Sequence, residues 1–138
     1  MKQFLHILFT LITSLAFSQQ KQDTSSIAMV ASAHPMATEA GLLMLKQGGN
    51  AFDAIAASSF MLSVVEPSMS GLGGRLQAIY FVPGQGVKGL DATTQVPAGY
   101  IKKAKEAEQG YGTIGVPGMV KGIVQLHQQY GKLSLKQV

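Results

Sequence analysis

The sequence predicts an α/β fold, because stretches with the apolar spacing of helices flank two short stretches typical of strands. Residues 35–47 and 50–65 have helical spacing, residues 76–82 and 87–91 are typical of the two strands of a hairpin, and residues 120–130 have an amphipathic helical pattern. The composition is that of a folded chain, with 46% hydrophobic and 13% charged residues, which excludes intrinsic disorder. At 138 residues the chain has room for one domain.

The start of the chain predicts a secretory signal peptide. Lys2 supplies a positive charge ahead of a mostly apolar run from Phe4 to Phe17, and Ala16 and Ser18 place small residues where a signal peptidase cuts. The run is shorter than the ~20 apolar residues that span a membrane, so a membrane anchor is the less favoured alternative. We therefore expect cleavage between Ser18 and Gln19 and an exported protein, periplasmic or secreted, with no stable membrane anchor.

This division gives three segments: a signal peptide at 1–18, a polar lead-in at 19–27 and one domain at 28–138. The domain is expected to be incomplete. Residues 133–138 have the pattern of a helix that is just beginning, with Ser134 as its N-cap. A chain that stops inside such a segment is expected to be a fragment, or a subunit that needs a partner.

The first elements of the domain follow from short-range signals. Residues 27–31 are a brief apolar run that predicts a buried strand. Pro35 suits the first turn of a helix, where its missing N–H costs nothing. Gly48 and Gly49 then end that helix, because glycine tolerates the left-handed conformation of a helix C-terminus.

The second helix begins at Asn50. Asn50 as N-cap and Asp53 three residues later match a capping box. Residues 54–65 are apolar on nearly every side and rich in small residues. A helix of this kind is expected to be buried on every side, inside a larger body than this chain alone provides.

The rest of the chain alternates turns with regular elements. Glu66-Pro67 ends the second helix, residues 68–75 form a glycine-rich turn, and the predicted hairpin follows. Residues 100–109 predict an exposed helix, residues 110–118 a loop, and Gly131 closes the last amphipathic helix.

Several classes of function are excluded or disfavoured. The chain has no cysteine, which excludes disulfides and thiolate catalysis. Its net charge of +4 is mild, and a solvated helix face explains its one lysine cluster better than nucleic acid does. The glycine-rich turn lacks the spacing of a dinucleotide fingerprint, and the histidines lack metal spacing and are expected to be structural or exposed. We therefore expect no cofactor, no metal and no nucleic-acid partner. The lysines are Lys102, Lys103 and Lys105, the turn is Gly71-x-Gly73-Gly74, and the histidines are His6, His34 and His127.

Several separated motifs, taken in order and spacing, resemble the start of the γ-glutamyltranspeptidase large subunit. The resemblance covers essentially the whole domain at 28–138, and no single glycine motif would be as specific. The motifs are Met29 to Gly41, Gly48 to Ala54, Val65-Glu66-Pro67, Ser70 to Gly74, Gly115 to Gly118 and Leu126 to Gly131.

The resemblance implies an αββα sandwich of the N-terminal-nucleophile hydrolase type, of which this chain would hold only the N-terminal portion. Precursors of the family cut themselves into two subunits. The new N-terminal threonine of the small subunit attacks γ-glutamyl amides such as glutathione and passes the acyl group to water or to an amino acid. Its own α-amine, with a reference pKa near ~8, suits the role of base. The resemblance places this threonine beyond Val138, so that no catalytic residue falls on this chain. The implied partners are γ-glutamyl small molecules and the small subunit.

One stretch departs from the family pattern. The family commonly has an arginine before an Ala-Pro that holds the α-carboxylate of the glutamyl group, and the resemblance puts it at Thr93 or at Gln95, where this chain has none. Arg75 is the only arginine in the chain, and it follows the glycine-rich turn, which the resemblance places near the substrate. A guanidinium binds a carboxylate with two parallel hydrogen bonds. We expect Arg75 to recognise the acyl group, with Gln95 and Thr94 as neutral helpers. The alternative is an arginine with a surface or structural role.

The missing arginine leaves the function open at a finer level. The first interpretation is the N-terminal part of an exported γ-glutamyltransferase-like hydrolase, inactive as a fragment. An acylase-like relative with another acyl group is the nearest alternative. A non-catalytic binding or scaffold protein made from the partial fold is the alternative of a different class.

Overall fold

The computed structural model describes residues 23–102 and 109–138. The predicted signal peptide, residues 19–22 of the lead-in at 19–27 and residues 103–108 of the helix predicted at 100–109 lie outside the described residues, as do two lysines of the predicted cluster. The flanking residues 100–102 and 109 are not helical.

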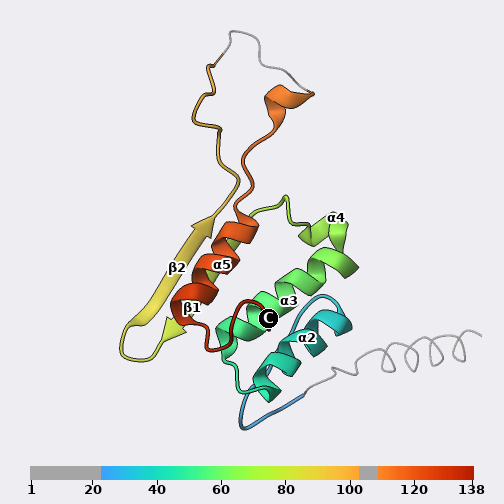
Figure 1. Ribbon diagram of the computed structural model, residues 1–138, viewed down its shortest axis with the longest axis vertical. Helices are drawn as coiled ribbons and strands as arrows, with labels where there is room; N and C mark the ends of the chain where they lie inside the picture. The colour runs from blue at the N-terminus through green and yellow to red at the C-terminus, as the bar shows by residue number, and fades with distance from the viewer. Residues whose placement is uncertain (1–22, 103–108) are drawn as a thin grey trace, which may run out of the picture.

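The described elements form helices packed against a two-stranded hairpin (Figure 1). The helix α5 lies between the hairpin and α3, while α2 packs on the other side of α3. The single turn α4 continues from the end of α3. In chain order the elements are α2 (Pro35–Lys46), α3 (Ala51–Val65), α4 (Pro67–Ser70), β1 (Leu76–Val82), β2 (Gly86–Ala92), the 3-10 turn η1 (Tyr111–Thr113) and α5 (Met119–Tyr130).

The helix α2 begins and ends where the sequence predicts. Pro35 is its first residue, and the Nδ1 atom of His34 caps it by accepting a hydrogen bond of 3.2 Å from the amide of Met36. Gly48 follows the helix with a φ of 86°, a left-handed conformation that favours glycine. His34 therefore has a structural role, as predicted.

The capping box predicted for α3 is present. The Asn50 side chain accepts hydrogen bonds from the amides of Phe52 and Asp53, at 2.8 Å and 3.3 Å. In return, the Asp53 carboxylate accepts one of 2.7 Å from the Asn50 amide. This arrangement fixes the direction in which α3 starts and brings the Asp53 side chain into the interior.

Small residues let α2 and α3 approach closely. A Cβ atom on Gly41 would lie only 2.4 Å from Ser58 Oγ and 3.2 Å from the Ala54 carbonyl oxygen. The Ser58 hydroxyl donates to the Ala37 carbonyl across the interface, at 2.7 Å. Ser58 is thus a buried polar group with a partner, as burial requires.

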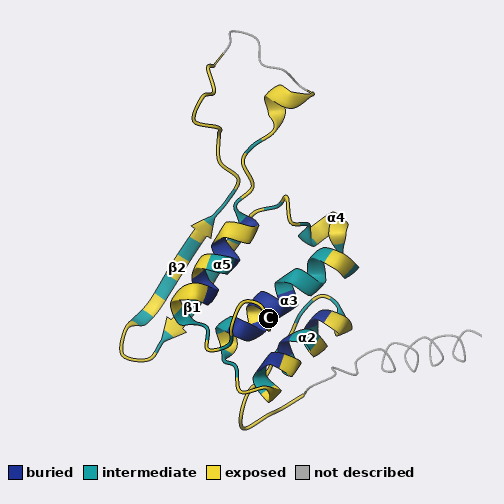
Figure 2. Cartoon of the chain, in the orientation of Figure 1, coloured by how far each residue is buried: buried dark blue, intermediate teal, exposed yellow. Residues whose placement is uncertain are grey.

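The burial of α3 is concentrated in its first half within the described part of the chain (Figure 2). Ala54, Ala56 and Ser58 are buried, whereas Ile55 and Val64 are 51% and 74% exposed. These residues therefore do not give the predicted all-round burial: the buried positions of α3 all lie between Asp53 and Ser58, and no described element covers Ile55 or Val64.

The predicted hairpin is confirmed. The strands β1 and β2 pair antiparallel from Leu76 opposite Ala92 to Val82 opposite Gly86, and both alternate between half-buried and exposed residues. One face lies against the helices and carries Leu76 and Ala92. The other face is apolar and open, with Ile79, Phe81 and Val87 exposed by 86%, 64% and 73%.

The core joins α3, α5 and the start of β1. Ala56, Met119 and Ile123 are buried together, and Phe60, Leu76 and Val138 pack against them. None of the described helices is both long enough and apolar enough to cross a membrane.

Two other predictions have a different outcome at the ends of the domain. The strand predicted at 27–31 is wrong: these residues form no strand and Ile27 is 95% exposed, because no neighbouring described strand offers a partner. The helix start predicted at 133–138 is a single turn. The N-cap pattern is nevertheless present, since Ser134 and Gln137 each accept a hydrogen bond from the other's amide, at 3.3 Å and 3.0 Å.

Candidate functional site

Two cavities lie beside the contact between the glycine-rich turn and the beginning of α5. The amides of Gly118 and Met119 both donate to the Gly74 carbonyl, at 3.3 Å. One cavity of about 380 Å³ has Gly74 and Met119 in its wall. The other, of about 400 Å³, has Gly118 in its wall. Both volumes fall in the range of small-molecule sites, ~300–1,000 Å³.

Arg75 lines the smaller cavity. The wall is largely apolar, with Leu62, Met69 and Ile123 among its residues, and Ser59 and Ser70 add hydroxyl groups. Arg75 is exposed. The ion pair found among the described residues joins His127 and Asp53, so Arg75 has no carboxylate partner in that part of the chain. A guanidinium in this position can receive a carboxylate.

Gln95 lines the larger cavity, and its backbone is fixed there. Its amide donates to the Val116 carbonyl at 3.0 Å, and its carbonyl accepts from the Val116 amide at 2.8 Å. This pair of hydrogen bonds joins the two chain segments that run up to and back from residues 103–108 (Figure 1). Asp91 and Lys121 line the same cavity; the sequence did not single them out.

Thr94 is exposed and is not in the wall of either cavity. Its methyl group lies against Gly115, where an added Cβ atom would come within 2.2 Å of it. The structure therefore places Arg75 in one cavity, Gln95 in the other and Thr94 beside the second. The three residues predicted to act together do not share one cavity.

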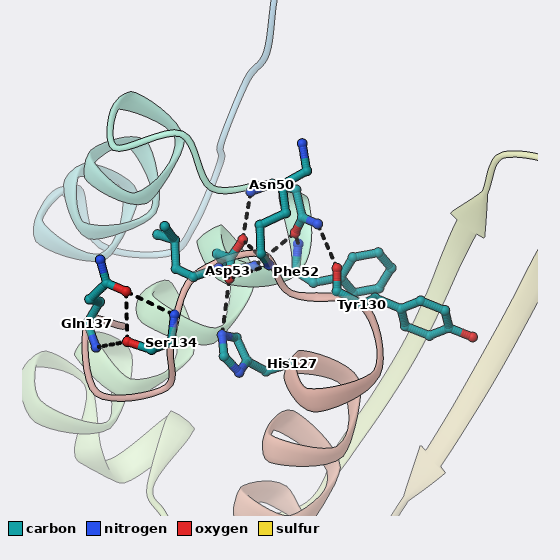
Figure 3. A network of polar contacts seen from close by, with 9 residues as sticks. Asn50, Phe52, Asp53, His127, Tyr130, Ser134 and Gln137 are labelled. Atoms are coloured by element: carbon teal, nitrogen blue, oxygen red, sulfur yellow. Dashed lines mark hydrogen bonds and ion pairs between the residues drawn. The ribbon is translucent and has the colours of Figure 1, made fainter.

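A buried polar network at the opposite end of α5 was missed by sequence reasoning (Figure 3). Asp53 is fully buried, and its carboxylate meets His127 Nε2 at 3.1 Å. The same carboxylate accepts hydrogen bonds from the amides of Asn50, Lys132 and Leu133, at 2.7–3.2 Å. The network ties the start of α3 to the end of α5 and to the segment that follows.

An aromatic cluster lies beside this network. The rings of Phe52 and Tyr130 are stacked with centroids 4.8 Å apart, and the Tyr80 ring is 5.6 Å from each. The side-chain amide of Asn50 donates to the Tyr130 carbonyl at 2.6 Å. Lys88 on β2 donates to the Tyr130 hydroxyl at 3.2 Å. Three elements, α3, α5 and the hairpin, are therefore locked together at this end.

The surroundings of Asp53 hold it in the carboxylate form. Burial acts to raise the pKa of Asp53, because a buried charge loses its hydration. The hydrogen bonds from the amides of Asn50, Lys132 and Leu133, together with the attraction of His127, outweigh burial and leave the pKa below its ordinary value of 3.8.

The geometry gives this network a structural role rather than a catalytic one. Asp53 has no exposed surface and His127 has 5%, so neither reaches a substrate in the described chain. His127 Nδ1 is buried without a partner in that part of the chain. The predicted structural role of His127 agrees with this burial. In residues 23–102 and 109–138, no three His, Cys, Asp or Glu side chains gather as a metal site would need.

The family follows from comparison with known proteins. The family model described as Gamma-glutamyltranspeptidase matches residues 37–138. This chain belongs to the gamma-glutamyltranspeptidase family. It is similar to the glutathione hydrolase proenzyme of Bacillus subtilis (strain 168), with 37% identity over 136 residues, 89% of this chain and 23% of that protein. The chain thus spans about a quarter of the length of that relative.

Two further known proteins, one of them a solved structure, are similar to this chain. The crystal structure of Helicobacter pylori gamma-glutamyltranspeptidase matches with a TM-score of 0.75 and 31% identity, covering 85% of this chain and 36% of that one. The acylase ACY 1 proenzyme of Pseudomonas sp. (strain V22) is 34% identical over 137 residues, 87% of this chain and 24% of that protein.

These likenesses confirm the predicted family and fold class. The chain is part of an α/β structure of the N-terminal-nucleophile hydrolase type, and it contributes the hairpin and the helices packed against one face of it. The roles expected of Arg75, Gln95 and Thr94 stay predictions.

Proposed function

We propose that this chain is the N-terminal part of an exported, self-processing amide hydrolase and acyltransferase that acts on γ-glutamyl compounds such as glutathione. The observation that carries the proposal is the family match over residues 37–138, together with a relative named a glutathione hydrolase proenzyme. The apolar run behind Lys2 supports export. The proposed location is periplasmic or secreted.

The proposed nucleophile is a threonine beyond Val138, released as a new N-terminus by self-cleavage. Its hydroxyl oxygen attacks the amide carbonyl, its α-amine accepts the hydroxyl proton, and that proton then goes to the leaving amine. Water or an amino acid releases the acyl group. The chain described here supplies no such nucleophile, so we expect it to be inactive alone.

The small subunit of the same precursor is the proposed partner. The outer face of the hairpin exposes Ile79, Phe81 and Val87, an apolar patch that water does not favour. Both hairpin edges also lack a neighbouring strand among the described residues. A second sheet laid on this face would cover the patch.

Arg75 is the proposed carboxylate-binding residue for the acyl group. Its guanidinium has no carboxylate partner among residues 23–102 and 109–138, and its cavity has largely apolar walls to which Ser59 and Ser70 add hydroxyls. This set suits a carboxylate carried on an aliphatic chain. Gln95 and Thr94 are the proposed neutral helpers. They lie near the second cavity, so any help from them is less direct.

An acylase with a different acyl group is the second candidate function. Two observations favour it: residues 90–97 contain no arginine, and a relative of similar identity is named an acylase proenzyme. Without a carboxylate-binding group, the same nucleophile would accept a simple aliphatic acyl chain.

Paired amide substrates decide between the two functions. The processed protein that carries this chain is assayed on a γ-glutamyl anilide, on the anilide that lacks the α-carboxylate, and on a plain acyl anilide. A strong preference for the first supports the proposal. Equal or better turnover of the plain acyl anilide supports the acylase, and turnover of none of the three contradicts both functions.

A further inference from the structure

We propose that Ser63 on α3 is a positioning residue for Arg75, because its hydroxyl holds the glycine-rich turn that leads to Arg75. The proposal rests on the proposed function, in which Arg75 binds the carboxylate of the acyl group. Ser63 is not among the residues that line either cavity. We therefore expect it to act on a ligand through Arg75 and not by direct contact.

The first argument is the hydrogen bonding of the Ser63 hydroxyl. Its oxygen lies 3.0 Å from the Ser59 carbonyl oxygen, one helical turn earlier, and 2.8 Å from the Ser70 carbonyl oxygen at the end of α4. A hydroxyl has one proton to donate, so the two carbonyls share it. Among the described residues no backbone amide donates to the Ser70 carbonyl, as is common for the last carbonyls of a helical turn. Ser63 thus supplies the donor that the described backbone does not.

The second argument is how the rest of the turn is held. The Gly74 carbonyl accepts hydrogen bonds from amides at the beginning of α5, and the Gly74 amide donates to the Gly71 carbonyl at 3.0 Å. Met69 and Leu72 are 83% and 54% exposed, so neither side chain packs the turn firmly against the described chain, and the glycines add backbone freedom. The turn is therefore held by hydrogen bonds, from α3 at Ser70 and from α5 at Gly74.

The third argument is the place of the Ser63 hydrogen bonds relative to the cavity of Arg75. Ser59 and Ser70, whose carbonyls share the Ser63 proton, both line this cavity of about 380 Å³. Ser59 belongs to α3 and Ser70 to α4, so the hydroxyl joins two elements of the cavity wall. Without it, α4 and the turn are less constrained relative to α3, and Arg75 moves with them. A displacement of about 1 Å in a site is enough to lower a rate about a hundredfold.

The test compares Ser63→Ala with Ser58→Ala. Ser58 also lies on α3 and also donates to a carbonyl of another helix, that of Ala37, at 2.7 Å, but it lines neither cavity. The processed protein is assayed on a γ-glutamyl anilide and on the anilide that lacks the α-carboxylate. We expect Ser63→Ala to raise the KM for the first by about threefold to tenfold, as the loss of one neutral hydrogen bond predicts. Its kcat and its KM for the second anilide should be unchanged. Ser58→Ala should lower the melting temperature but leave both KM values unchanged.

A matched pair of variants isolates the hydroxyl of residue 63. Threonine keeps a hydroxyl that can donate to the carbonyl four residues earlier, whereas valine has nearly the same shape without it. Ser63→Thr should therefore keep a KM close to that of the wild type, and Ser63→Val should behave as Ser63→Ala does. Equal KM values for the threonine and valine variants would overturn the proposal. Failure of both Ser63→Ala and Ser63→Thr to self-process would show a folding role and would overturn it as well.

Hydrogen exchange gives a readout that needs no catalysis. Peptides that cover residues 66–76 report how readily the turn opens. We expect faster exchange in these peptides for Ser63→Ala than for the wild type, and no change for Ser58→Ala. Unchanged exchange in Ser63→Ala, or a similar increase in both variants, would contradict the proposal. Faster exchange with an unchanged preference for the carboxylated anilide would also contradict it, because the turn would then not position Arg75.

The two measurements separate the role of Ser63 from the proposed function. A wild-type protein that cleaves no γ-glutamyl anilide would contradict the proposed function, while hydrogen exchange would still decide whether Ser63 holds the turn. A wild-type protein that cleaves the anilide with a KM that Ser63→Ala does not change would contradict the role of Ser63 alone.

Discussion

The two ends of α5 differ in what surrounds them. At its C-terminal end, the buried Asp53 carboxylate contacts His127 and accepts hydrogen bonds from three backbone amides. An aromatic cluster packs beside this junction. At its N-terminal end, two cavities carry Arg75 and Lys121, both exposed and without carboxylate partners in the described chain. One end therefore holds the helix in place, whereas the other leaves two cations without a carboxylate partner among the described residues.

The two ends of α5 differ for a physical reason. A buried carboxylate that loses its partners is costly, so a network like that of Asp53 is tolerated where it is fully satisfied and rigid. A ligand site needs the opposite condition, since its charges must remain unneutralised until the ligand arrives.

The largest effect is expected from Asp53→Ala. The substitution leaves the buried His127 and the half-buried amides of Lys132 and Leu133 without their acceptor. We expect a loss of about 3–5 kcal/mol in the free energy of unfolding, measured by denaturant unfolding of the processed protein. Asp23→Ala is the matched control: Asp23 is exposed, and its replacement should change stability by less than about 0.5 kcal/mol. Equal stability of the two variants would show that the junction does not anchor α5.

A smaller loss is expected from Gly131→Ala. The added Cβ atom would lie 2.6 Å from the His127 carbonyl oxygen, 2.8 Å from His127 Cδ2 and 2.9 Å from Asp53 Oδ1. Relief of these contacts must shift the ion pair, at a cost of about 1–3 kcal/mol. Gly99→Ala is the control, because a Cβ atom there meets nothing within 4 Å. The measurement is the melting temperature of each variant. A Gly131→Ala protein as stable as the control would contradict tight packing at this junction.

The sequence predicts much of the structure at the C-terminal end of α5 but little of the structure at its N-terminal end. Asn50 and Asp53 are three positions apart, so the capping box is a local pattern. The partner of Asp53, however, is His127, which lies 74 positions away along the chain, and no periodicity connects the two. Only the tertiary fold brings them together.

The predicted acyl site is divided although the hairpin is as predicted. The alternation of apolar residues predicts both strands, and these are present. Their register pairs Leu76 with Ala92, so Arg75 and Gln95 lie at the same end of the hairpin. Gly74, whose carbonyl accepts a hydrogen bond from the Gly118 amide, nevertheless lines the cavity of Arg75, whereas Gly118 lines the cavity of Gln95. Residue types alone could suggest a shared role for Arg75 and Gln95, but they could not show which wall each residue occupies.

Substitution of Arg75 tests the cavities at the N-terminal end of α5. If Arg75 holds the α-carboxylate, Arg75→Ala should lower kcat/KM on a γ-glutamyl amide by about tenfold to a hundredfold, because a charge-assisted hydrogen bond contributes roughly 1.5–3 kcal/mol. Arg75→Lys should recover part of the loss. The same amide without its α-carboxylate should be unaffected. Stability should also be unchanged, since Arg75 is exposed and unpaired among the described residues.

The controls for Arg75 separate recognition from folding. Lys136→Ala removes an exposed cation that lines neither cavity and should retain full activity. If Arg75→Ala processes normally and keeps the wild-type preference for the carboxylated amide, Arg75 does not bind the carboxylate. If it fails to self-process while Arg75→Lys succeeds, the residue is needed for folding, and the role proposed for it is again contradicted.

The smallest effect is expected from a change of pH, which acts through Asp53 near the C-terminal end of α5. Burial acts to raise the pKa of Asp53. The hydrogen bonds from the amides of Asn50, Lys132 and Leu133 and the charge of His127 lower that pKa by more than burial raises it, so its folded pKa is below 3.8. A carboxyl whose pKa falls on folding stabilises the folded state at pH values above its unfolded pKa, and this stabilisation is lost as pH falls through the folded value. Stability from Asp53 should thus be fully present at neutral pH and decline below about pH 4. Because burial offsets part of what the hydrogen bonds contribute, the decline should be smaller than the loss in Asp53→Ala.

The measurement is the difference in unfolding free energy between the wild type and Asp53→Asn, which cannot titrate, from pH 7 to pH 3. A constant difference over this range would mean that the Asp53 carboxylate is not stabilised by the network, and that its hydrogen bonds only offset its burial.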